Sequence, residues 1–376
     1  MPRHSTPALR LRLLASVPAL ALGLAGGACG GSSPQPVDPD TRPPDDGAPD
    51  TDAGASLDPT PGTYRETCDG SGAIALDFQH FLDVNDENQG ARVYRRAMDG
   101  APGRTLDISA ALGLTTADEG DLEDVARIGD RLYLITSHGR NTSGQLRPAR
   151  YRFGAVELSG TAPDIALAPA GSTQTLLQAL LVAGNWDAPD AAVIAALTTS
   201  SKLGDASDPD LAPEDQGTNI EGLAADGTGK LVIGFRNPRP GARAIVVGLA
   251  NPAAVVAGQT PRFTGAGALD LGGLGIRGMA WSAAHGAILV LAGPHDGGAP
   301  GPFRLYKWSG VLGEAPALAT VITAPANSAP EAVVPYPGTR DVQILFDQGD
   351  ALIGGTICKD TAAAQRRFTD TIVHVD

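Results

Sequence analysis

The amino-acid sequence predicts an all-β protein, a β-propeller of six blades that carries a short helical insertion. The composition is the first reason: 48 Gly and 30 Pro among 376 residues, with only 5% aromatic residues, indicate many turns and few long helices. The second reason is a hairpin unit that recurs along the chain. Blades of four strands commonly repeat every ~40–50 residues, so a folded body of roughly 300 residues would hold about six of them.

The recurring unit consists of two apolar strands joined by a turn with Gly or Asp, followed by a polar cluster. Its four copies begin at residues 122, 220, 276 and 330 with "LEDVARIGDRLYLITSHGRN", "IEGLAADGTGKLVIGFRNP", "IRGMAWSAAHGAILVLAGPHD" and "PEAVVPYPGTRDVQILFDQGD". Each copy has a charged residue near its start, at steps of 98, 56 and 54 residues: Glu123, Glu221, Arg277 and Glu331. We expect these four to converge on the propeller axis, because every innermost strand starts at the same depth in the channel.

The first step is nearly twice as long as the others, and we expect it to contain one further blade and an insertion. The spacing of Leu and Ala in "TQTLLQALLVAGNW" and "DAAVIAALTTSSKLG" favours short helices, which places the helical insertion at about residues 170–216. A β-sandwich with a small helical domain is the alternative architecture. It explains the strands equally well, but it gives no cause for the recurring charged position.

Residues 1–28 have the features of a signal peptide. A basic start precedes an apolar run that is too short for a membrane-spanning helix, and small residues lead to Cys29. Because Cys29 directly follows Ala28, the segment resembles the lipobox of bacterial lipoproteins, which implies that the thiol is acylated and anchors an exported protein to a membrane of the cell envelope. Secretion after cleavage near Ala28 is the alternative.

Residues 29–62 follow as a tether. This stretch is rich in Pro, Asp, Gly, Ser and Thr and has almost nothing apolar to bury, so we expect it to stay extended and disordered. The folded body is then residues 63–376, with Cys68 and Cys358 near its ends. We expect a disulfide between these two in an oxidising compartment, because a closed circular fold needs its ends fastened. Two unrelated buried thiols are the alternative.

The net charge limits the classes of partner. Of the formal −14, −11 falls on residues 63–376. An acidic body repels phosphate backbones, so nucleic acid is disfavoured. Small molecules, metal ions, glycans and protein surfaces remain open. The sequence contains no H-E-x-x-H, C-x-x-C or G-x-S-x-G pattern, which argues against a zinc site and against a hydrolase with a Ser nucleophile elbow.

Several stretches resemble the domain of unknown function 3616 family: "DLEDVARIGDRLYLITSHGRN", "RYRF", "NIEGLAADGTGKLVIGFRNPRPGARAIVVGLANP" and "LDLGGLGIRGMAW", over most of residues 119 to 290. No activity is assigned to that family, so the resemblance implies no function. Glu221 with Gly222 is also similar to the six-bladed calcium-dependent lactonase and phytase-like propellers. In those proteins, acidic and amide side chains at the channel mouth hold a metal. Arg277 departs from that pattern, since a cation opposes metal binding.

The candidate site follows from these positions. The catalytic candidates are Glu123, Glu221, Glu331 and His138; the candidate ligands for Ca²⁺ are Glu221 and Glu331; the candidate ligand-binding residues are Asn219, Arg236, Asn237 and Arg277. Residues that follow the second strands, such as Arg236 and Asp347, are expected at another depth or even on another face, because propeller strands alternate in direction.

Two functions fit this site. The first is a binding or interaction module at the cell envelope, whose charged ring aligns the blades through ion pairs. The alternative is a metal-dependent hydrolase of a lactone or phosphoester. There Ca²⁺ would polarise the ester oxygen, His138 or Glu123 would act as general base, and Arg236 and Arg277 would orient an anionic group.

Overall fold

The computed structural model describes residues 56–214, 216–297 and 301–376. The predicted signal peptide, Cys29 and nearly all of the predicted tether lie outside these residues. No helix within the described ranges has the length and apolar character needed to cross a bilayer. Leu57 is buried and its backbone N–H donates to Asp341, so the packed body begins before the expected boundary at residue 63.

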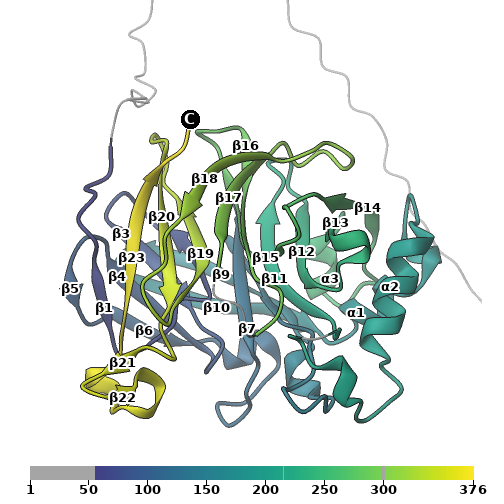
Figure 1. Ribbon diagram of the computed structural model, residues 1–376, viewed down its shortest axis with the longest axis horizontal. Helices are drawn as coiled ribbons and strands as arrows, with labels where there is room; N and C mark the ends of the chain where they lie inside the picture. Colours follow the sequence, from purple (N-terminus) through teal and green to yellow (C-terminus); the bar gives the residue numbers. More distant parts are fainter. Residues whose placement is uncertain (1–55, 215, 298–300) are drawn as a thin grey trace, which may run out of the picture. The chain divides into compact units, whose positions relative to one another are not determined.

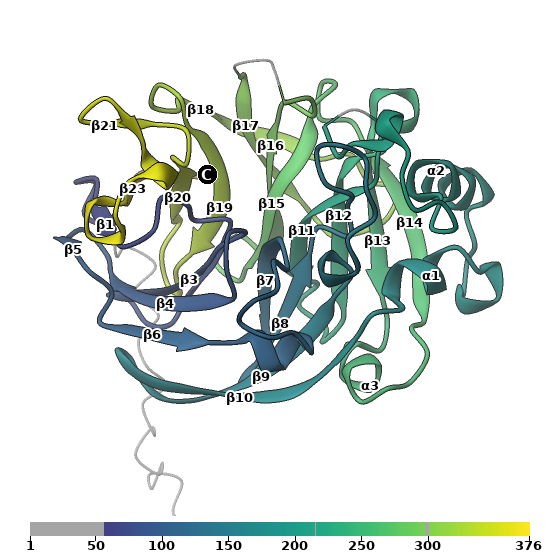
Figure 2. The same cartoon turned by 90° about the horizontal axis from the view of Figure 1, so that it is seen from below.

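Five sheets surround a central channel, which makes the body a five-bladed β-propeller (Figures 1 and 2). The first blade consists of β2 (Gly72–Ala75), β3 (His80–Val84), β4 (Gly90–Arg95) and β6 (Arg104–Asp107). The second consists of β7 (Leu122–Ile128), β8 (Arg131–Thr136), β9 (Phe153–Thr161) and β10 (Asp164–Thr173). The third consists of β11 (Asn219–Ala225), β12 (Leu231–Asn237), β13 (Ala244–Leu249) and β14 (Phe263–Leu269). The fourth consists of β15 (Gly275–Ser282), β16 (Ala287–Gly293), β17 (Phe303–Trp308) and β18 (Ala317–Ile322).

The fifth blade closes the ring with strands from both ends of the body. It begins with β19 (Ala329–Pro335), β20 (Asp341–Asp347) and β23 (Arg367–His374), and is completed by β1 (Thr63–Arg65) and β5 (Asp99–Gly100). β1 is antiparallel to β23 and parallel to β5. A disulfide bond joins Cys68, which follows β1, to Cys358, which lies between the small hairpin β21 (Leu352–Ile353) and β22 (Thr356–Ile357) and strand β23. Backbone pairing and a covalent bond thus fasten the same junction.

The described residues form three α-helices, which lie outside the sheets. α1 (Leu176–Leu180) and α2 (Ala191–Ser201) connect β10 to β11, and α3 (Pro252–Val256) connects β13 to β14. The carboxylate of Asp190 caps α2 by accepting from the backbone N–H groups of Ala192 and Val193. Both views show α1 and α2 beside the outer strands of the third blade (Figures 1 and 2), where their Leu side chains share an apolar cluster with Phe263 of β14.

The predicted β-propeller is confirmed, but the predicted six blades are wrong. The long step between Glu123 and Glu221 contains no additional blade, because it is filled by β9 and β10, of nine and ten residues, and by the helical connection. The blade that the repeat did not reveal precedes residue 122 and starts with β2. Its innermost strand, "GAIA", has no charged residue to align with the other four.

Apolar residues fill the spaces between neighbouring blades. Five buried clusters each join two adjacent sheets. β12, β13 and β16 are buried along their whole length, and their Val, Ile and Leu side chains suit strands that are covered on both faces. Since this packing lies between the blades, the innermost strands β2, β7, β11, β15 and β19 face the channel.

The innermost strands touch one another in the middle of the channel. A Cβ atom added to Gly72 would lie 2.7 Å from the Cα of Asp124, and one added to Gly278 would lie 2.2 Å from the backbone oxygen of Glu331. Asp124 also links three blades, because its Oδ2 accepts from the backbone N–H groups of Leu223 at 2.7 Å and Met279 at 3.3 Å. We call this narrow part of the channel, around Gly72, Asp124 and Gly278, the waist; one cavity lies on each side of it.

The waist predicts a sharp difference between two Gly→Ala substitutions. Gly278→Ala should lower the free energy of unfolding by about 3 kcal/mol or more, because the new methyl group meets backbone that cannot rotate away. Gly184→Ala is the matched control: a Cβ at Gly184 meets no atom within 4 Å, and its effect should stay within about 0.5 kcal/mol. Urea denaturation with the disulfide intact measures both. Equal stability of the two variants would contradict the tight contact between β15 and β19.

Candidate functional site

The charged residues that recur in the sequence stand at β-bulges in four of the five innermost strands. In β7, Leu122 pairs with Thr136 and Asp124 pairs with Ile135, so Glu123 is the extra residue. The corresponding register shifts enclose Glu221 in β11, Arg277 in β15 and Glu331 in β19. A bulge bends its strand and re-aims a side chain. The recurrence therefore has a geometric cause, since each bulge directs one charged side chain to the channel mouth.

The four bulges line a polar cavity of about 800 Å³ at this end of the channel. All five blades contribute to its wall, and the first blade does so through Asp86, which follows β3. The expectation that residues after the second strands lie at another depth or on another face is wrong for Arg236, Asp296 and Asp347. In an antiparallel hairpin the start of one strand lies beside the end of the next: Asn219 pairs with Asn237, and Ala329 pairs with Asp347. Arg236, Asp296 and Asp347 consequently line the same cavity.

Glu221 is the most heavily bonded carboxylate of the mouth. Its Oε1 accepts from Asn219 Nδ2 at 2.7 Å and from Arg236 Nη1 at 2.8 Å, and its Oε2 lies 2.9 Å from Arg277 Nη1. All four side chains are nearly inaccessible to solvent. Two arginines and one amide around this carboxylate hold the side chain of Glu221 in a fixed position.

Arg277 continues this chain of charges to the next blade, where its Nη2 forms an ion pair with Glu331. The guanidinium thus lies between the two carboxylates that were expected to hold Ca²⁺. Burial lowers the pKa of Arg277, but a guanidinium stays charged in proteins. A calcium ion between Glu221 and Glu331 would have to displace this cation, so the arrangement does not fit the expected metal site. Within the described ranges, no group of three or more His, Cys, Asp or Glu residues is placed to hold a metal ion.

Glu123 and Asp86 are among the carboxyl groups of the mouth that form no ion pair within the described residues. Burial raises the pKa of Glu123 well above its ordinary value, and the charges of Glu221 and Asp121 raise it further. Burial, followed by the charge of Asp347, raises the pKa of Asp86 to about 7. The raised pKa favours the protonated form of Glu123, which can donate a hydrogen bond, whereas an ionised carboxylate only accepts.

Two further acidic residues, Asp121 and Asp69, also have raised pKa values. Asp121 lies 2.9 Å from Arg150, yet burial raises its pKa to about 6. Asp69 is buried in the fifth-blade junction, and neither of its oxygens has a hydrogen-bond donor within the described part of the chain. Burial and the charge of Asp347 raise the pKa of Asp69 to about 11, so this carboxyl holds a proton as well.

Two candidate residues lie elsewhere. His138 is buried in the second blade, where its ring packs edge-on against Tyr151 and its Nδ1 lies 2.8 Å from the carbonyl oxygen of Thr136. It is not part of the cavity wall, and burial lowers its pKa to about 4. Asn237 is likewise outside that wall, and its Nδ2 donates to the backbone oxygens of Pro213 and His295. The role predicted for His138 as a base in this cavity does not fit its position, and Asn237 fastens two loops.

Sequence reasoning missed Asp86, Asp121 and Arg150 as residues of the mouth. Asp86 follows the second strand of the first blade, as Asp347 follows the second strand of the fifth. Recognition of the first blade would have revealed it. Asp121 directly precedes β7, so the same hairpin logic would have placed it at the mouth. Arg150 lies in the connection between β8 and β9, and the repeat contains no signal for it.

A family model described as "Protein of unknown function (DUF3616)" matches residues 102–341. The match contains the whole of the second, third and fourth blades and all four bulges. No curated protein sequence matches the chain.

Several solved structures are similar at low identity. The exo-β-1,3-galactanase of Phanerochaete chrysosporium shares 10% identity at a TM-score of 0.42, over 82% of this chain and 60% of that chain. A GH43 β-1,3-galactosidase shares 12% identity at a TM-score of 0.44, over 82% of this chain and 91% of that chain. A putative oxidoreductase (glucose dehydrogenase) of Thermus thermophilus shares 12% identity at a TM-score of 0.38, over 82% of this chain and 98% of that chain. Likenesses this distant carry no statement about activity.

The raised pKa of Asp86 predicts a pH-dependent effect on stability. A carboxyl whose pKa is higher in the folded state stabilises the fold below its unfolded pKa, and this contribution is lost as pH rises through the folded value. The variant Asp86→Asn should therefore gain stability relative to the original protein between about pH 4 and about pH 7. A difference of one between the folded-state and unfolded-state pKa changes the free energy of unfolding by up to about 1.4 kcal/mol. Thermal unfolding across this range measures the difference.

Asp99→Asn is the control, because the pKa of Asp99 is shifted in the opposite direction from that of Asp86. A hydrogen bond from Arg65 lowers the pKa of Asp99, so the stability that Asp99 contributes is lost only as the pH falls below about 4. Its stability difference should stay level between pH 4 and pH 7. If Asp86→Asn behaved in the same way, Asp86 would not hold a proton in the folded protein.

Proposed function

The chain belongs to the DUF3616 family, whose membership assigns no activity, and we propose that its channel mouth binds a small polyhydroxylated ligand, a saccharide, with a preference for one that carries a positive charge. The observation that carries this proposal is the composition of the cavity wall. Among the described lining residues, nine carboxyl side chains face three arginines: Asp86, Asp121, Glu123, Glu214, Glu221, Asp296, Glu331, Asp347 and Asp350 against Arg150, Arg236 and Arg277.

The charge of the wall decides between ligand classes. Arg277 and Arg236 are already bound to Glu221, so neither is free to bind an anionic group. The remaining excess of carboxyl groups repels phosphoesters and carboxylates and attracts ammonium groups. This argues against the phosphoester substrate expected from the sequence and favours a neutral or cationic ligand.

The hydrogen-bonding groups suit hydroxyl-rich molecules. A sugar hydroxyl is both a donor and an acceptor. The ionised carboxylates would accept from such hydroxyls, and the protonated Glu123 would donate to one. Asn219 Oδ1 is buried without a donor among the described residues, and a ligand O–H or N–H would supply one. A cavity of about 800 Å³ lies within the usual size range of small-molecule sites.

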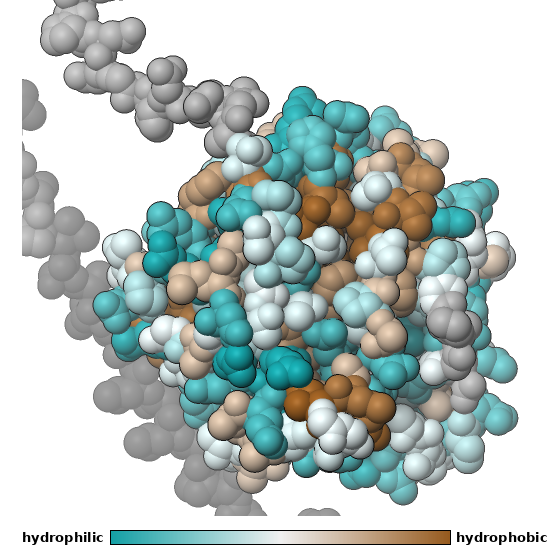
Figure 3. Space-filling view, turned by 60° about the vertical axis from the view of Figure 1, so that its left-hand side comes forward, coloured by the Kyte–Doolittle hydropathy of each residue, from teal (hydrophilic) through white to brown (hydrophobic). Residues whose placement is uncertain are grey.

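The exposed surface favours a small ligand over a broad protein interface. On the face in Figure 3, apolar residues form separate patches among hydrophilic ones. The exposed large apolar side chains, such as Phe78, Val182, Val311 and Leu352, come from separate elements. Stable protein interfaces bury contiguous patches with an apolar centre.

We place this binding function outside the cytoplasm, on a protein anchored through Cys29 to a membrane of the cell envelope. The signal-like residues 1–28 and the lipobox-like position of Cys29 support this location. The disulfide between Cys68 and Cys358 supports it as well, because such bonds persist in oxidising compartments.

Three related sugars that are positively charged, neutral and negatively charged test the binding proposal. Calorimetric titration of residues 56–376 with glucosamine, glucose and glucuronate should give the tightest binding for glucosamine and the weakest for glucuronate. A tenfold difference in the dissociation constant corresponds to about 1.4 kcal/mol of binding free energy. Asp347→Asn should reduce the advantage of glucosamine over glucose, while Asp130→Asn, on the exposed turn between β7 and β8, should leave it unchanged. Tightest binding of glucuronate, or no binding by any of the three, would refute the proposal.

Hydrolysis of the bound ligand is a second candidate, favoured by one observation. Glu123, with its raised pKa, lines the same cavity as Glu221, and a pair of carboxyl groups can serve as acid and base when one of them holds a proton. The chromogenic p-nitrophenyl glycoside of the best-bound sugar would be the substrate. Turnover that disappears in Glu123→Gln while sugar binding persists would establish catalysis, and binding without turnover would leave a binding protein.

A further inference from the structure

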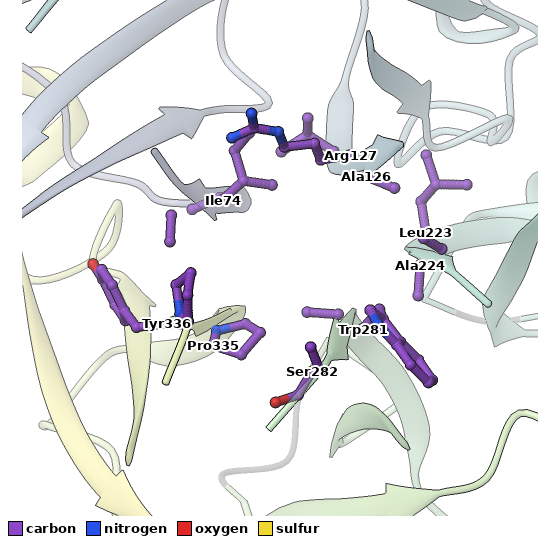
Figure 4. Close-up of a pocket in the computed structure, with 16 residues that line it drawn as sticks. Ile74, Ala126, Arg127, Leu223, Ala224, Trp281, Ser282, Pro335 and Tyr336 are labelled. Atoms are coloured by element: carbon purple, nitrogen blue, oxygen red, sulfur yellow. The ribbon is translucent and has the colours of Figure 1, made fainter. Parts of the chain in front are cut away.

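The channel has a second cavity at its opposite end, where the innermost strands finish (Figure 4). Its volume is about 440 Å³, and all five blades contribute to its wall. Ile74, Arg127, Leu223 and Trp281 belong to β2, β7, β11 and β15, and Tyr336 directly follows β19. The labelled side chains in Figure 4 surround an open centre. The waist at Asp124 separates this cavity from the acidic mouth.

Small side chains keep this cavity open. Alanines near the ends of four innermost strands form much of the wall, among them Ala75, Ala126, Ala224 and Ala280. Innermost strands of a propeller converge, so larger side chains at these positions would fill the space. The lining is mainly apolar, in contrast to the carboxyl groups at the other mouth. The two ends of one channel thus differ in chemistry.

Two aromatic side chains give the cavity rigid walls. A Cβ added to Gly227, at the tip of the hairpin between β11 and β12, would lie 2.7 Å from the Trp281 ring, so this turn holds the indole in place. Within the described chain, the indole N–H makes no hydrogen bond. The hydroxyl of Tyr336 donates to Gln343 at 2.7 Å, and the guanidinium of Arg96 lies 5.5 Å from the ring centre. Fixed aromatic walls favour a flat ligand.

Arg127 is the one charged side chain among the described residues of this wall. Its Nε donates to the backbone oxygen of Gly129 at 2.8 Å, which holds the guanidinium at the rim. Its nearest carboxylate, Asp130, is 3.6 Å from Nη2 and mostly exposed, and an exposed pair of this kind contributes little. The guanidinium therefore keeps donors for a ligand.

We propose that this cavity binds a small planar aromatic molecule that carries an acidic group. The ring would pack between Trp281 and the alanines, and the acid would bind the guanidinium of Arg127. A blind, mainly apolar cavity of this volume is typical of small-molecule sites. Because the body as a whole is acidic, non-specific attraction would favour a cation. Preference for an anion would therefore have to come from Arg127. This site is independent of the saccharide proposed at the other mouth.

Two naphthalene probes of opposite charge test the proposal. Calorimetric titration of residues 56–376 should show that 1-naphthoate binds at least tenfold more tightly than 1-naphthylmethylammonium. Arg127→Gln should remove this preference. Ala280→Leu, which adds bulk to the cavity wall, should weaken naphthoate binding at least tenfold. Thermal unfolding of each variant verifies that it is folded.

Glu123→Gln, at the opposite mouth, is the matched control and should leave naphthoate binding unchanged. Equal affinity for the two probes would mean that the cavity binds apolar molecules without regard to their charge, and would overturn the assignment of an acidic ligand. Naphthoate binding that survives both Arg127→Gln and Ala280→Leu would place the probe elsewhere. No binding of either probe at millimolar concentration by the folded protein would overturn the site itself.

Discussion

The site depends on one backbone feature, the β-bulge repeated in four innermost strands. Regular pairing would leave each charged residue in the ladder, whereas the extra residue at the bulge turns Glu123, Glu221, Arg277 and Glu331 to the channel mouth. Once they are there, electrostatics determines their roles. Arg277 forms ion pairs with two acidic neighbours and ties three blades together, whereas Glu123 forms no ion pair and its pKa is raised. A structural ring and a candidate binding group thus arise from the same repeated position.

The waist explains why one channel has two unlike ends. At its middle the strands approach so closely that only Gly fits at positions 72 and 278, and Asp124 satisfies buried N–H groups from two neighbouring blades. Bulged, charged residues line the cavity at one end and alanines line the cavity at the other, so each cavity has its own chemistry.

The sequence predicted the β-propeller and the convergence of the four charged residues, because the recurring pattern is local and comes from one hairpin per blade. The blade count failed because β2 has no charged residue to align and because long outer strands and helices fill the step after Glu123. The partner of each charge could not be predicted, since the contact of Arg277 with Glu331 depends on bulge geometry. The apolar cavity was missed for a related reason: alanines in a strand reveal an empty space only when five strands are placed around it.

The proposed binding site depends on carboxyl groups at the mouth that form no ion pair and have a raised pKa. This property can be measured by carbon-detected NMR titration of the side-chain carboxyl of Glu123, with Glu123→Gln for assignment. We expect a titration midpoint well above the ordinary value of a Glu, and a further rise in Arg277→Gln, because the charge of Arg277 lowers the pKa of Glu123. An ordinary midpoint that does not respond to Arg277 would show that Glu123 is solvated or paired, and would contradict the proposed acidic site.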